Sequence, residues 1–491
     1  MSYKSLISGT DIRGVASDLG GKEVTLTSAA VCDITSAFVV WLAKKLNKKP
    51  EDLCIAIGHD SRITAQRIKA EALSRLLLAG VKVMDCSLAS TPAMFMTTVE
   101  LNCDAAIQIT ASHHPFDRNG LKFFTRGGGL DSSDIAEIVD IADKNEIPKI
   151  NNGTVEKVDF MAAYSAILRN MICTALNKKQ SDLPLKGYKI IVDAGNGAGG
   201  FYAENVLKEL GADISGSQFL EPDGMFPNHI PNPENKAAME SICNAVVNSK
   251  ADLGIIFDTD VDRAGCVDKT GKEINRNRLI ALAAYIAMQN CKGATIVTDS
   301  VTSDGLKQFI EKYLGGRHYR YKRGYKNVIN KAIELCNNGE NCPLAIETSG
   351  HAALKENYFL DDGAYLATKI VIEVARGKNI DDILKNLVMP AEEREIRLNI
   401  KAEDFKAYGK DLIAKLEAFA QNSPECRIAD DNREGIRIYT NSGWMLARLS
   451  VHDPVIPVNF ESPEVGGVQK TVDFFKPFFA KFAELDLSAY N

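Results

Sequence analysis

The sequence lacks several features that would assign it to a specialised class of protein. No apolar run reaches the roughly 18 residues that a membrane-spanning helix needs, so no transmembrane segment is expected. The first nine residues are polar and lack the apolar core of a secretory signal peptide. The eleven cysteines include no CxxC pair. A disulfide framework is therefore not expected, and a reduced, cytoplasmic location fits best.

An excess of positive charge is also absent. The net charge is −6 over 491 residues, whereas nucleic-acid binding normally needs a basic surface. We therefore expect neither nucleic acid nor a membrane as a partner. Small anionic metabolites remain possible ligands, because a local group of Arg, Lys and metal can bind them on an acidic protein. The sequence carries no signal for the oligomeric state.

A repeated unit runs through the first three quarters of the chain. A short apolar strand ends in a polar or Gly-rich turn, and a helix or a second strand follows. The predicted strand and helix pairs are Cys54–Ile57 with Thr64–Ala79, Tyr188–Val192 with a helix to about Leu210, and Ala294–Val297 with a helix to about Leu314. Three further predicted strands lead directly into loops of reactive residues: Ala105–Ile109, Leu253–Phe257 and Leu344–Ile346. Ligands usually bind at strand ends in α/β sheets, so these loops are expected to converge.

The last hundred residues follow a different pattern. Predicted strands alternate with two helices: strands Glu395–Ile400, Gly435–Thr440 and Trp444–Leu449, and helices Phe405–Ala420 and Val468–Leu485. A polar stretch from Lys144 to Lys157 reads as a linker. We therefore predict three related α/β domains, 1–155, 156–270 and 271–390, and a C-terminal α+β domain, 391–491.

Three carboxylates alternate in Asp258-Thr-Asp-Val-Asp262, directly after an apolar strand. They repel one another unless a cation or protons neutralise them. All-oxygen ligands favour Mg²⁺ or Ca²⁺. The EF-hand pattern fails, because Arg263 and Lys269 stand where that loop needs Gly and Glu. A solvated acidic turn is the alternative, and Arg263 beside a metal would suit a phosphate ligand.

The loop Thr110-Ala-Ser-His-His-Pro115 offers one hydroxyl, Ser112, at a strand end. A hydroxyl that faces a divalent cation can carry a phosphoryl group, because the metal neutralises charge on the transferred oxygens. An ordinary turn serine is the alternative. The Gly-x-Ser-x-Gly pattern of esterases is absent around Ser112.

Three weaker patterns remain. Glu347-Thr-Ser-Gly-His351 combines a carboxylate, a hydroxyl and an imidazole that could bind sugar hydroxyls, or it is a plain turn. Arg448, with Arg437 nearby, could bind a phosphate bidentately or lie at the surface. Gly195-Asn-Gly-Ala-Gly-Gly200 has the GxGxxG spacing of dinucleotide sites. A tight turn between strand and helix explains these glycines equally well.

Six motifs in order resemble the α-D-phosphohexomutase superfamily, which includes phosphomannomutase/phosphoglucomutase and phosphoglucosamine mutase. The resemblance covers nearly the whole chain. Its motifs are Gly9-Thr-Asp-Ile-Arg-Gly14, Thr110–Pro115, Asn119-Gly-Leu-Lys122, Val192-Asp-Ala-Gly-Asn-Gly197, Asp258–Arg263 and Glu347–His351.

This resemblance implies four domains around a central cleft and a set of residue roles. Ser112 would carry the phosphoryl group and bind Mg²⁺ together with Asp258, Asp260 and Asp262. Arg13 and Lys122 would assist proton and phosphoryl transfer, and His351 would relay a proton or contact the sugar. Glu347 and Ser349 would hold sugar hydroxyls, with Arg263, Tyr325, Arg448 and Ser450 completing the substrate site. The activity implied is interconversion of hexose 1-phosphate and hexose 6-phosphate through a hexose 1,6-bisphosphate.

The chain departs from the family pattern at three places. The usual Arg-Pro-Ser-Gly-Thr-Glu-Pro phosphate loop reads Arg448-Leu-Ser-Val-His-Asp-Pro454, so Val451 and His452 replace Gly and Thr. Tyr325 stands where bacterial phosphomannomutases often carry a histidine, and His114 replaces the more usual Asn. Thr348 stands where glucosamine enzymes typically carry Gln, which favours glucose and mannose phosphates.

Two other functions compete with a mutase. A phosphatase of the haloacid-dehalogenase type also uses an Asp-x-Asp at a strand end, but it leaves the Ser112 loop unexplained. A non-catalytic sugar-phosphate sensor would account for the altered loop at Val451 and His452. All three reactive loops are intact, which favours the enzyme.

Overall fold

The computed structural model describes residues 2–450 and 453–490, and the chain divides into two compact units. The first unit comprises Met1–Leu279 and Ser349–Asp382, and the second comprises Ile280–Thr348 and Ile383–Asn491. The division falls within two helices, α7 (Arg276–Met288) and α11 (Ile380–Leu384), and between Thr348 and Ser349. No helix in the described residues is long and apolar enough to cross a membrane.

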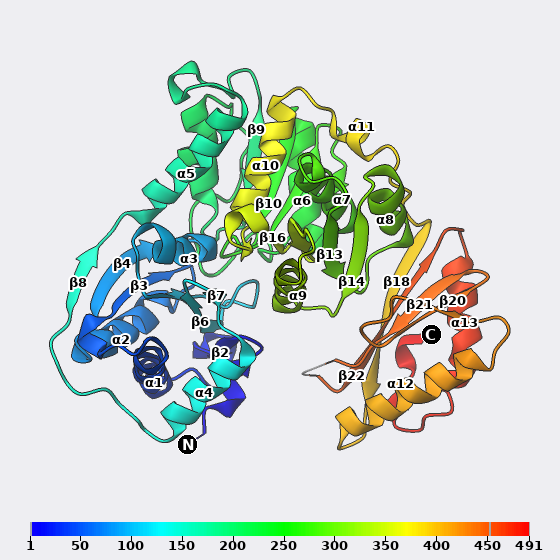
Figure 1. The fold of residues 1–491 in the computed structure, drawn as a ribbon, viewed down its shortest axis with the longest axis horizontal. Coiled ribbons are helices and arrows are strands. Elements are labelled where there is room, and N and C mark those ends of the chain that lie inside the picture. Colours follow the sequence, from blue (N-terminus) through cyan, green and yellow to red (C-terminus); the bar gives the residue numbers. More distant parts are fainter. Residues whose placement is uncertain (1, 451–452, 491) are drawn as a thin grey trace. The chain divides into compact units, whose positions relative to one another are not determined.

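A mixed sheet forms the N-terminal part of the first unit (Figure 1). Its strands lie in the order β1-β2-β6-β5-β3-β4-β8, with β7 paired to β6. The strands β5, β3, β4 and β8 run parallel, whereas β2 and β6 are antiparallel to their neighbours. The bounds are β1 Ile7–Ser8, β2 Asp11–Val15, β3 Cys54–His59, β4 Lys82–Leu88, β5 Ala105–Ile109, β6 Arg118–Thr125, β7 Gly128–Gly129 and β8 Thr154–Lys157.

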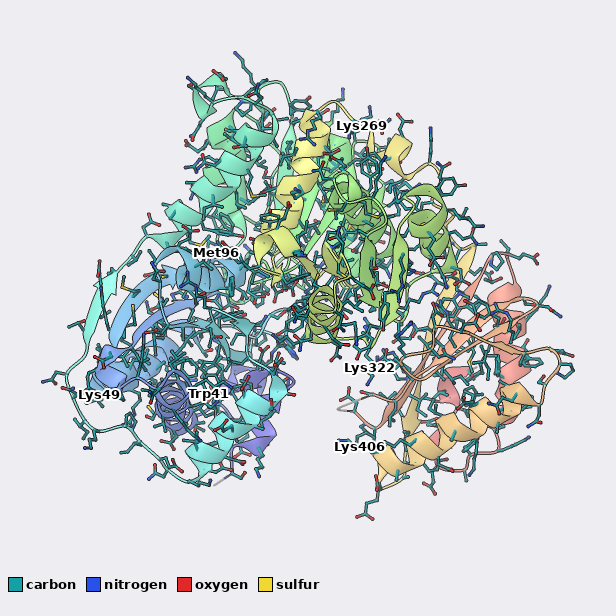
Figure 2. All side chains as sticks on the ribbon, in the orientation of Figure 1. Trp41, Lys49, Met96, Lys269, Lys322 and Lys406 are labelled. Carbon is teal, nitrogen blue, oxygen red and sulfur yellow. The ribbon has the colours of Figure 1, made fainter. Side chains whose placement is uncertain are left out.

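Helices cover both faces of this sheet, so its central strands are buried on both sides. The helices α1 (Ser28–Leu46), α2 (Ala65–Leu78) and α4 (Ser132–Asp143) share one apolar core with Ile55 and Ile107. The helix α3 (Thr91–Glu100) packs on the other side, where Gln108 donates a hydrogen bond to the Ala89 carbonyl. Trp41 on α1 and Met96 on α3, both labelled in Figure 2, mark the two layers. Burial on both sides explains why these strands read as continuous apolar runs.

A smaller sheet completes the first unit, in the strand order β12-β11-β10-β9. The strands β9 and β10 are parallel, whereas β10 and β11 form an antiparallel pair that Asp258–Arg263 connects. The bounds are β9 Ile190–Asp193, β10 Leu253–Phe257, β11 Ala264–Asp268 and β12 Glu273–Ile274. The hairpin of β16 (Ala352–Leu354) and β17 (Leu360–Asp361) and the helices α5 (Phe160–Ala175), α6 (Lys236–Ser249) and α10 (Gly363–Ala375) also belong to this unit.

The second unit carries parallel strands in the order β14-β13-β15 and a separate antiparallel sheet in the order β19-β20-β21-β22-β18-β23. The antiparallel sheet and the helices α12 and α13 share one apolar core. The bounds are β13 Thr295–Asp299, α8 Asp304–Gln308, β14 Arg317–Tyr321, α9 Tyr325–Asn337, β15 Leu344–Ile346, β18 Glu392–Ile400, α12 Phe405–Gln421, β19 Arg427–Ile428, β20 Ile436–Thr440, β21 Gly443–Ala447, β22 Val455–Ser462, α13 Gly467–Phe479 and β23 Leu485–Asp486.

Three sequence-based expectations need correction. The polar stretch read as a linker ends in the strand β8, which is polar because all four of its side chains are exposed at the sheet edge. The helices expected to reach Leu210 and Leu314 contain π-helical turns, Tyr202–Leu207 and Phe309–Tyr313. Apolar pairs spaced by four residues satisfy an α-helix and a π-turn alike, so the sequence could not distinguish them. The last helix stops at Phe479, because Leu485 instead pairs with Ile400 in the sheet.

Candidate active site

Three loops of the first unit meet around Arg263. The Ser112 loop connects β5 to β6, the Asp258–Arg263 loop connects β10 to β11, and His351 immediately precedes β16. The Ser112 Oγ donates to Asp258 Oδ2 at 3.1 Å, and Arg263 forms a backbone bridge with His351. The structure therefore brings Ser112, the carboxylates and His351 together.

Both central loops hold a side-chain-bearing residue in the left-handed backbone region. Ser112 has φ of 50° and Val261 has φ of 68°, and such residues cost on the order of 1–3 kcal/mol each. Hydrogen bonds fix both conformations: Thr110 Oγ1 accepts from the Ser112 N–H at 2.9 Å, and the Val261 carbonyl accepts from the Gly363 N–H at 3.1 Å. These two backbone conformations orient the Ser112 hydroxyl and the aspartates toward each other.

A buried arginine that the sequence analysis did not single out shapes the Ser112 loop. The Arg62 guanidinium donates to the carbonyls of Ser112 and His114, and it also reaches the Pro115 carbonyl at 2.7 Å. Arg62 follows β3 in Gly58-His-Asp-Ser-Arg62, just as Ser112 follows β5. That shared position at a strand end is the signal that could have identified it.

Asp60 supports this arginine clamp. Its side chain is fully buried and lies 3.3 Å from Arg62 Nε, and it accepts from Thr110 Oγ1 at 2.7 Å. Burial raises the pKa of Asp60 to about 6, against the opposing charge of Arg62. The clamp therefore couples the ends of β3 and β5, and it fixes the backbone from which Ser112 projects.

The three aspartates form a compact buried cluster. One carboxylate oxygen of each lies within 4.8 Å of the others. Lys122 Nζ lies 2.5 Å from Asp262 and 3.5 Å from Asp260, and Arg263 Nη2 lies 3.0 Å from Asp258. Burial is the main reason that the pKa of Asp258 is raised well above its usual range, and the negative charge of Asp262 adds to this effect. Burial alone would also raise the pKa of Asp262, but Lys122 and Arg263 outweigh it and lower that pKa.

This cluster fits a divalent cation. The Oδ1 atoms of Asp260 and Asp262 are buried, and no group in the described residues donates a hydrogen bond to them. A buried carboxylate oxygen without a donor is costly, and a cation removes that cost. Its all-oxygen donor set matches the preference of Mg²⁺ and Ca²⁺. The Thr91 hydroxyl, at the first residue of α3, donates to Asp260 Oδ2 at 2.5 Å and orients this carboxylate.

His113 is a further contact of Ser112 that the sequence analysis did not assign. Its Nδ1 accepts from Arg263 Nη2 at 2.6 Å and lies 3.2 Å from Ser112 Oγ. Burial lowers the pKa of His113 to about 2, and the Arg263 charge adds to this effect. The imidazole is therefore neutral and faces Arg263 as an acceptor. Arg263 in turn approaches Ser112 Oγ at 3.3 Å.

The remaining predicted residues of the first unit lie near this cluster. Burial lowers the pKa of His351 well below its usual range, and the charges of Arg263 and Lys122 add to the shift. Ser349 Oγ lies 2.7 Å from His351 Nδ1. Arg13 pairs with Asp11 at 2.6 Å, and it stands opposite Gly120 in the β2–β6 register.

The second unit carries Glu347, Tyr325, Arg448 and Ser450. Glu347 Oε1 accepts from the Gly324 N–H at 2.6 Å, and Tyr325 begins α9. Burial lowers the pKa of Arg448, and the charge of Arg323 adds to this effect. Ser450 Oγ accepts from the Asp453 N–H at 3.2 Å. The replacements at Val451 and His452 lie outside the described residues.

Arg437 is not a surface residue, although the sequence left that alternative open. It is 2% exposed, its guanidinium stacks 3.5 Å from the Trp444 ring centroid, and it donates to the Thr302 carbonyl at 2.8 Å. These contacts fasten the loop after β13 to β20 and β21 inside the second unit. They give Arg437 a structural role.

Gly197, the second glycine of the GxGxxG segment, packs against the carboxylate loop. A Cβ added to Gly197 would lie 2.5 Å from the Thr259 carbonyl oxygen and 2.8 Å from its Cα. The neighbouring Ala198 N–H donates to that same carbonyl at 2.8 Å. Close backbone approach between two loops therefore accounts for Gly197.

We expect Gly197→Ala to push the Asp258–Arg263 loop out of place. Because the clash is with backbone, the free energy of unfolding should fall by about 1–3 kcal/mol, with turnover reduced roughly tenfold. Urea denaturation and initial rates measure the two effects. Gly127→Ala is the matched control, since its added Cβ would meet nothing closer than 3.7 Å. Equal effects from both substitutions would contradict this packing role.

Comparisons with known proteins identify the family. Three family models match: phosphoglucomutase/phosphomannomutase alpha/beta/alpha domain I over residues 6–149, domain II over residues 163–271 and domain III over residues 275–390. The fold and the matches together define a phosphohexomutase of the isomerase class. The chain belongs to the phosphoglucomutase/phosphomannomutase family.

Individual relatives agree over most of their length. The chain is 28% identical to phosphomannomutase/phosphoglucomutase of Pseudomonas aeruginosa, with 93% of this chain and 92% of the relative covered. It is 29% identical to phosphoglucomutase/phosphomannomutase of Thermococcus kodakarensis, with 92% and 93% covered. The crystal structure of a phosphoglucomutase/phosphomannomutase family protein from Burkholderia thailandensis superposes with a TM-score of 0.81 at 26% identity, covering 99% of both chains.

Proposed function

We propose that this chain interconverts hexose 1-phosphate and hexose 6-phosphate, with glucose and mannose as the sugars, through a phosphoserine at Ser112. The observation that carries the proposal is the contact of Ser112 Oγ with Asp258 Oδ2 at 3.1 Å, inside a cluster of buried carboxylates and cations. A plain turn serine does not need such surroundings.

Charge explains why this serine suits phosphoryl transfer. A phosphoserine carries about −1.5 to −2 charges at neutral pH. Beside three carboxylates, that charge requires compensation beyond Arg263 and Lys122. Asp258, Asp260, Asp262 and the phosphoserine would hold Mg²⁺, which neutralises charge on the transferred oxygens. Ser112 is 3% exposed, and this burial protects the phosphoester from water.

The proposed reaction consists of two successive phosphoryl transfers. In the first, the free sugar hydroxyl attacks phosphorus, the bond from phosphorus to Ser112 Oγ breaks, and the hydroxyl proton passes to a neighbouring base. The product is a hexose 1,6-bisphosphate, which also loads unphosphorylated protein as an activator. After this intermediate reorients, Ser112 Oγ attacks the phosphorus of the other phosphoryl group. The bond from that phosphorus to the sugar oxygen breaks, the sugar oxygen takes up the proton held by the base, and Ser112 regains its phosphate. Arg13, Lys122 and His351 are the groups proposed to move the proton and stabilise charge.

The remaining predicted residues bind the substrate. We assign sugar hydroxyls to Glu347 and Ser349, because a carboxylate and a hydroxyl accept and donate in the pattern that sugars need. Arg448 and Ser450 would hold the phosphate that is not being transferred. Arg263 and Tyr325 would also contact the substrate. The four-domain division and a cytoplasmic location remain part of this proposal.

Direct turnover tests the function. Purified protein is given glucose, mannose, glucosamine or N-acetylglucosamine 1-phosphate, with Mg²⁺ and a trace of hexose 1,6-bisphosphate, and the 6-phosphate is measured. We expect rapid conversion of the glucose and mannose compounds and slower conversion of the amino sugars. Release of inorganic phosphate from the bisphosphate without isomerisation would establish a phosphatase instead. No conversion of any of the four would overturn the proposal.

A further inference from the structure

Two cysteine sulfur atoms lie in contact at the start of β3 and β5. Cys54 Sγ and Cys103 Sγ are 3.7 Å apart. Cys54 is the first residue of β3, and Cys103 lies two residues before β5. The site is at the opposite end of these strands from the Arg62 clamp and the Ser112 loop. It therefore plays no part in the phosphoryl transfer proposed above.

The backbone holds the two cysteines in place. The Asp104 N–H donates to the Cys54 carbonyl at 2.7 Å, and the Cys54 N–H donates to Asp104 Oδ2 at 3.0 Å. The Cys103 N–H donates to the Thr97 carbonyl at the end of α3. A disulfide bond needs the sulfur atoms to close to about 2.05 Å. From their present separation of 3.7 Å, the two sulfur atoms need to approach each other by about 1.6 Å.

The two thiols have different environments. Cys54 is partly exposed, whereas Cys103 is 2% exposed. The hydrogen bond with the Cys103 thiol lowers the pKa of Cys54, and the charge of Lys82 adds to this effect against the opposing influence of burial. The same hydrogen bond, together with burial, raises the pKa of Cys103. An accessible thiolate with a protonated thiol behind it is the arrangement of a reactive cysteine and its resolving partner.

We propose that Cys54 and Cys103 form a reversible dithiol–disulfide site that reacts with hydroperoxides. The Cys54 thiolate attacks one peroxide oxygen, the O–O bond breaks, and the leaving hydroxide or alkoxide takes up a proton. The resulting Cys54 sulfenic acid is attacked by the Cys103 sulfur, which forms the S–S bond and releases water. The two thiols lose two electrons and two protons in total, and the peroxide accepts them. A dithiol reductant then restores the two thiols by thiol–disulfide exchange and is itself oxidised to a disulfide.

Such a pair is consistent with a reducing compartment. Disulfides there are usually transient and redox-sensing. The two sulfur atoms are already in contact in the dithiol form, which suits reversible formation of a disulfide. The bond would link the starting points of the two strands that end at the Arg62 clamp and the Ser112 loop.

Peptide mapping tests the proposal on the full chain. Reduced protein receives one equivalent of hydrogen peroxide at neutral pH, is alkylated in denaturant and is digested. We expect the free-thiol count to fall by two from eleven, with a crosslinked Cys54–Cys103 peptide that dithiothreitol releases. Cys54→Ser and Cys103→Ser should each abolish the crosslink. Cys32→Ser, at a partly exposed cysteine on α1 of the same sheet domain, should leave it unchanged.

A second measurement remains informative if a variant crosslinks elsewhere. Cys103→Ala removes the donor to Cys54, so the rate at which Cys54 reacts with a disulfide reagent at neutral pH should fall by roughly tenfold. Circular dichroism confirms that the variant is folded. An unchanged rate, or accumulation of Cys54 sulfinic acid in the unmodified chain while Cys103 stays a free thiol, would overturn the proposal. Ser112→Ala should still form the crosslink, so this result is independent of the mutase assay.

Discussion

Ser112→Ala is expected to lower kcat for hexose phosphate conversion by at least about a thousandfold, because the covalent acceptor of the phosphoryl group is lost. The fold should survive. Ser112 Oγ bonds to Asp258 and Arg263, and these two side chains also pair with each other at 3.0 Å. Coupled assays of glucose 6-phosphate formation measure the loss. Residual activity of a few per cent or more would contradict a phosphoserine.

Transfer of labelled phosphate shows directly whether Ser112 is the residue that carries the phosphoryl group. Unmodified protein incubated with hexose 1,6-bisphosphate labelled in its phosphates should acquire label at the peptide containing Ser112, and the alanine variant should acquire none. Ser36→Ala is the matched control, since Ser36 Oγ bonds only its own helix at the Cys32 carbonyl among the described contacts. The control should keep full activity and labelling. Rapid release of inorganic phosphate that persists in Ser112→Ala would identify a phosphatase.

The strands that lead into the reactive loops could be predicted closely. Ala105–Ile109, Leu253–Phe257 and Leu344–Ile346 coincide with β5, β10 and β15. Apart from Gln108 in β5, each is free of polar side chains because neighbouring layers bury both of its faces, and polar residues follow at once. Local sequence therefore contains the whole signal. It contains much less for β8, whose edge position gives it no apolar face.

The centre of the site could also be predicted, but its supporting residues could not. Ser112 and the three aspartates stand out because hydroxyl and carboxylate groups follow buried strands. Arg62 acts through carbonyls some fifty residues later, and Thr91 acts on Asp260, 169 positions away. Contacts of this kind depend on how sheets and loops pack. The position of Arg62 after β3 marks it as a candidate but does not predict which carbonyls it binds, and Thr91 carries no local pattern that predicts its contact with Asp260.

Asp260→Asn is expected to raise the Mg²⁺ concentration for half-maximal activity by at least about tenfold, and to reduce turnover at low Mg²⁺ by about a hundredfold. Asp260 is fully buried, Thr91 orients its Oδ2, and its Oδ1 has no donor among the described residues. The amide keeps the shape but removes one negative charge and one cation ligand. Mg²⁺ titration of the initial rate measures the change. An unchanged titration would remove Asp260 from the metal site.

Stability of the same variant should move in the opposite direction. Without divalent cation, the three buried carboxylates repel one another. Removing one charge should therefore raise the free energy of unfolding by about 1 kcal/mol, as often follows when a functional residue is replaced. In the unmodified protein Mg²⁺ should raise Tm, because it binds the folded state alone, and this increment should shrink in Asp260→Asn. Asp268→Asn, at a buried aspartate outside the cluster on β11, should retain the full Mg²⁺ increment. If Asp260 is a metal ligand, Asp260→Asn should be more stable than the unmodified protein in EDTA and should lose the increase in Tm that Mg²⁺ causes. If Asp260 were only structural, its replacement would lower the free energy of unfolding both in EDTA and in Mg²⁺.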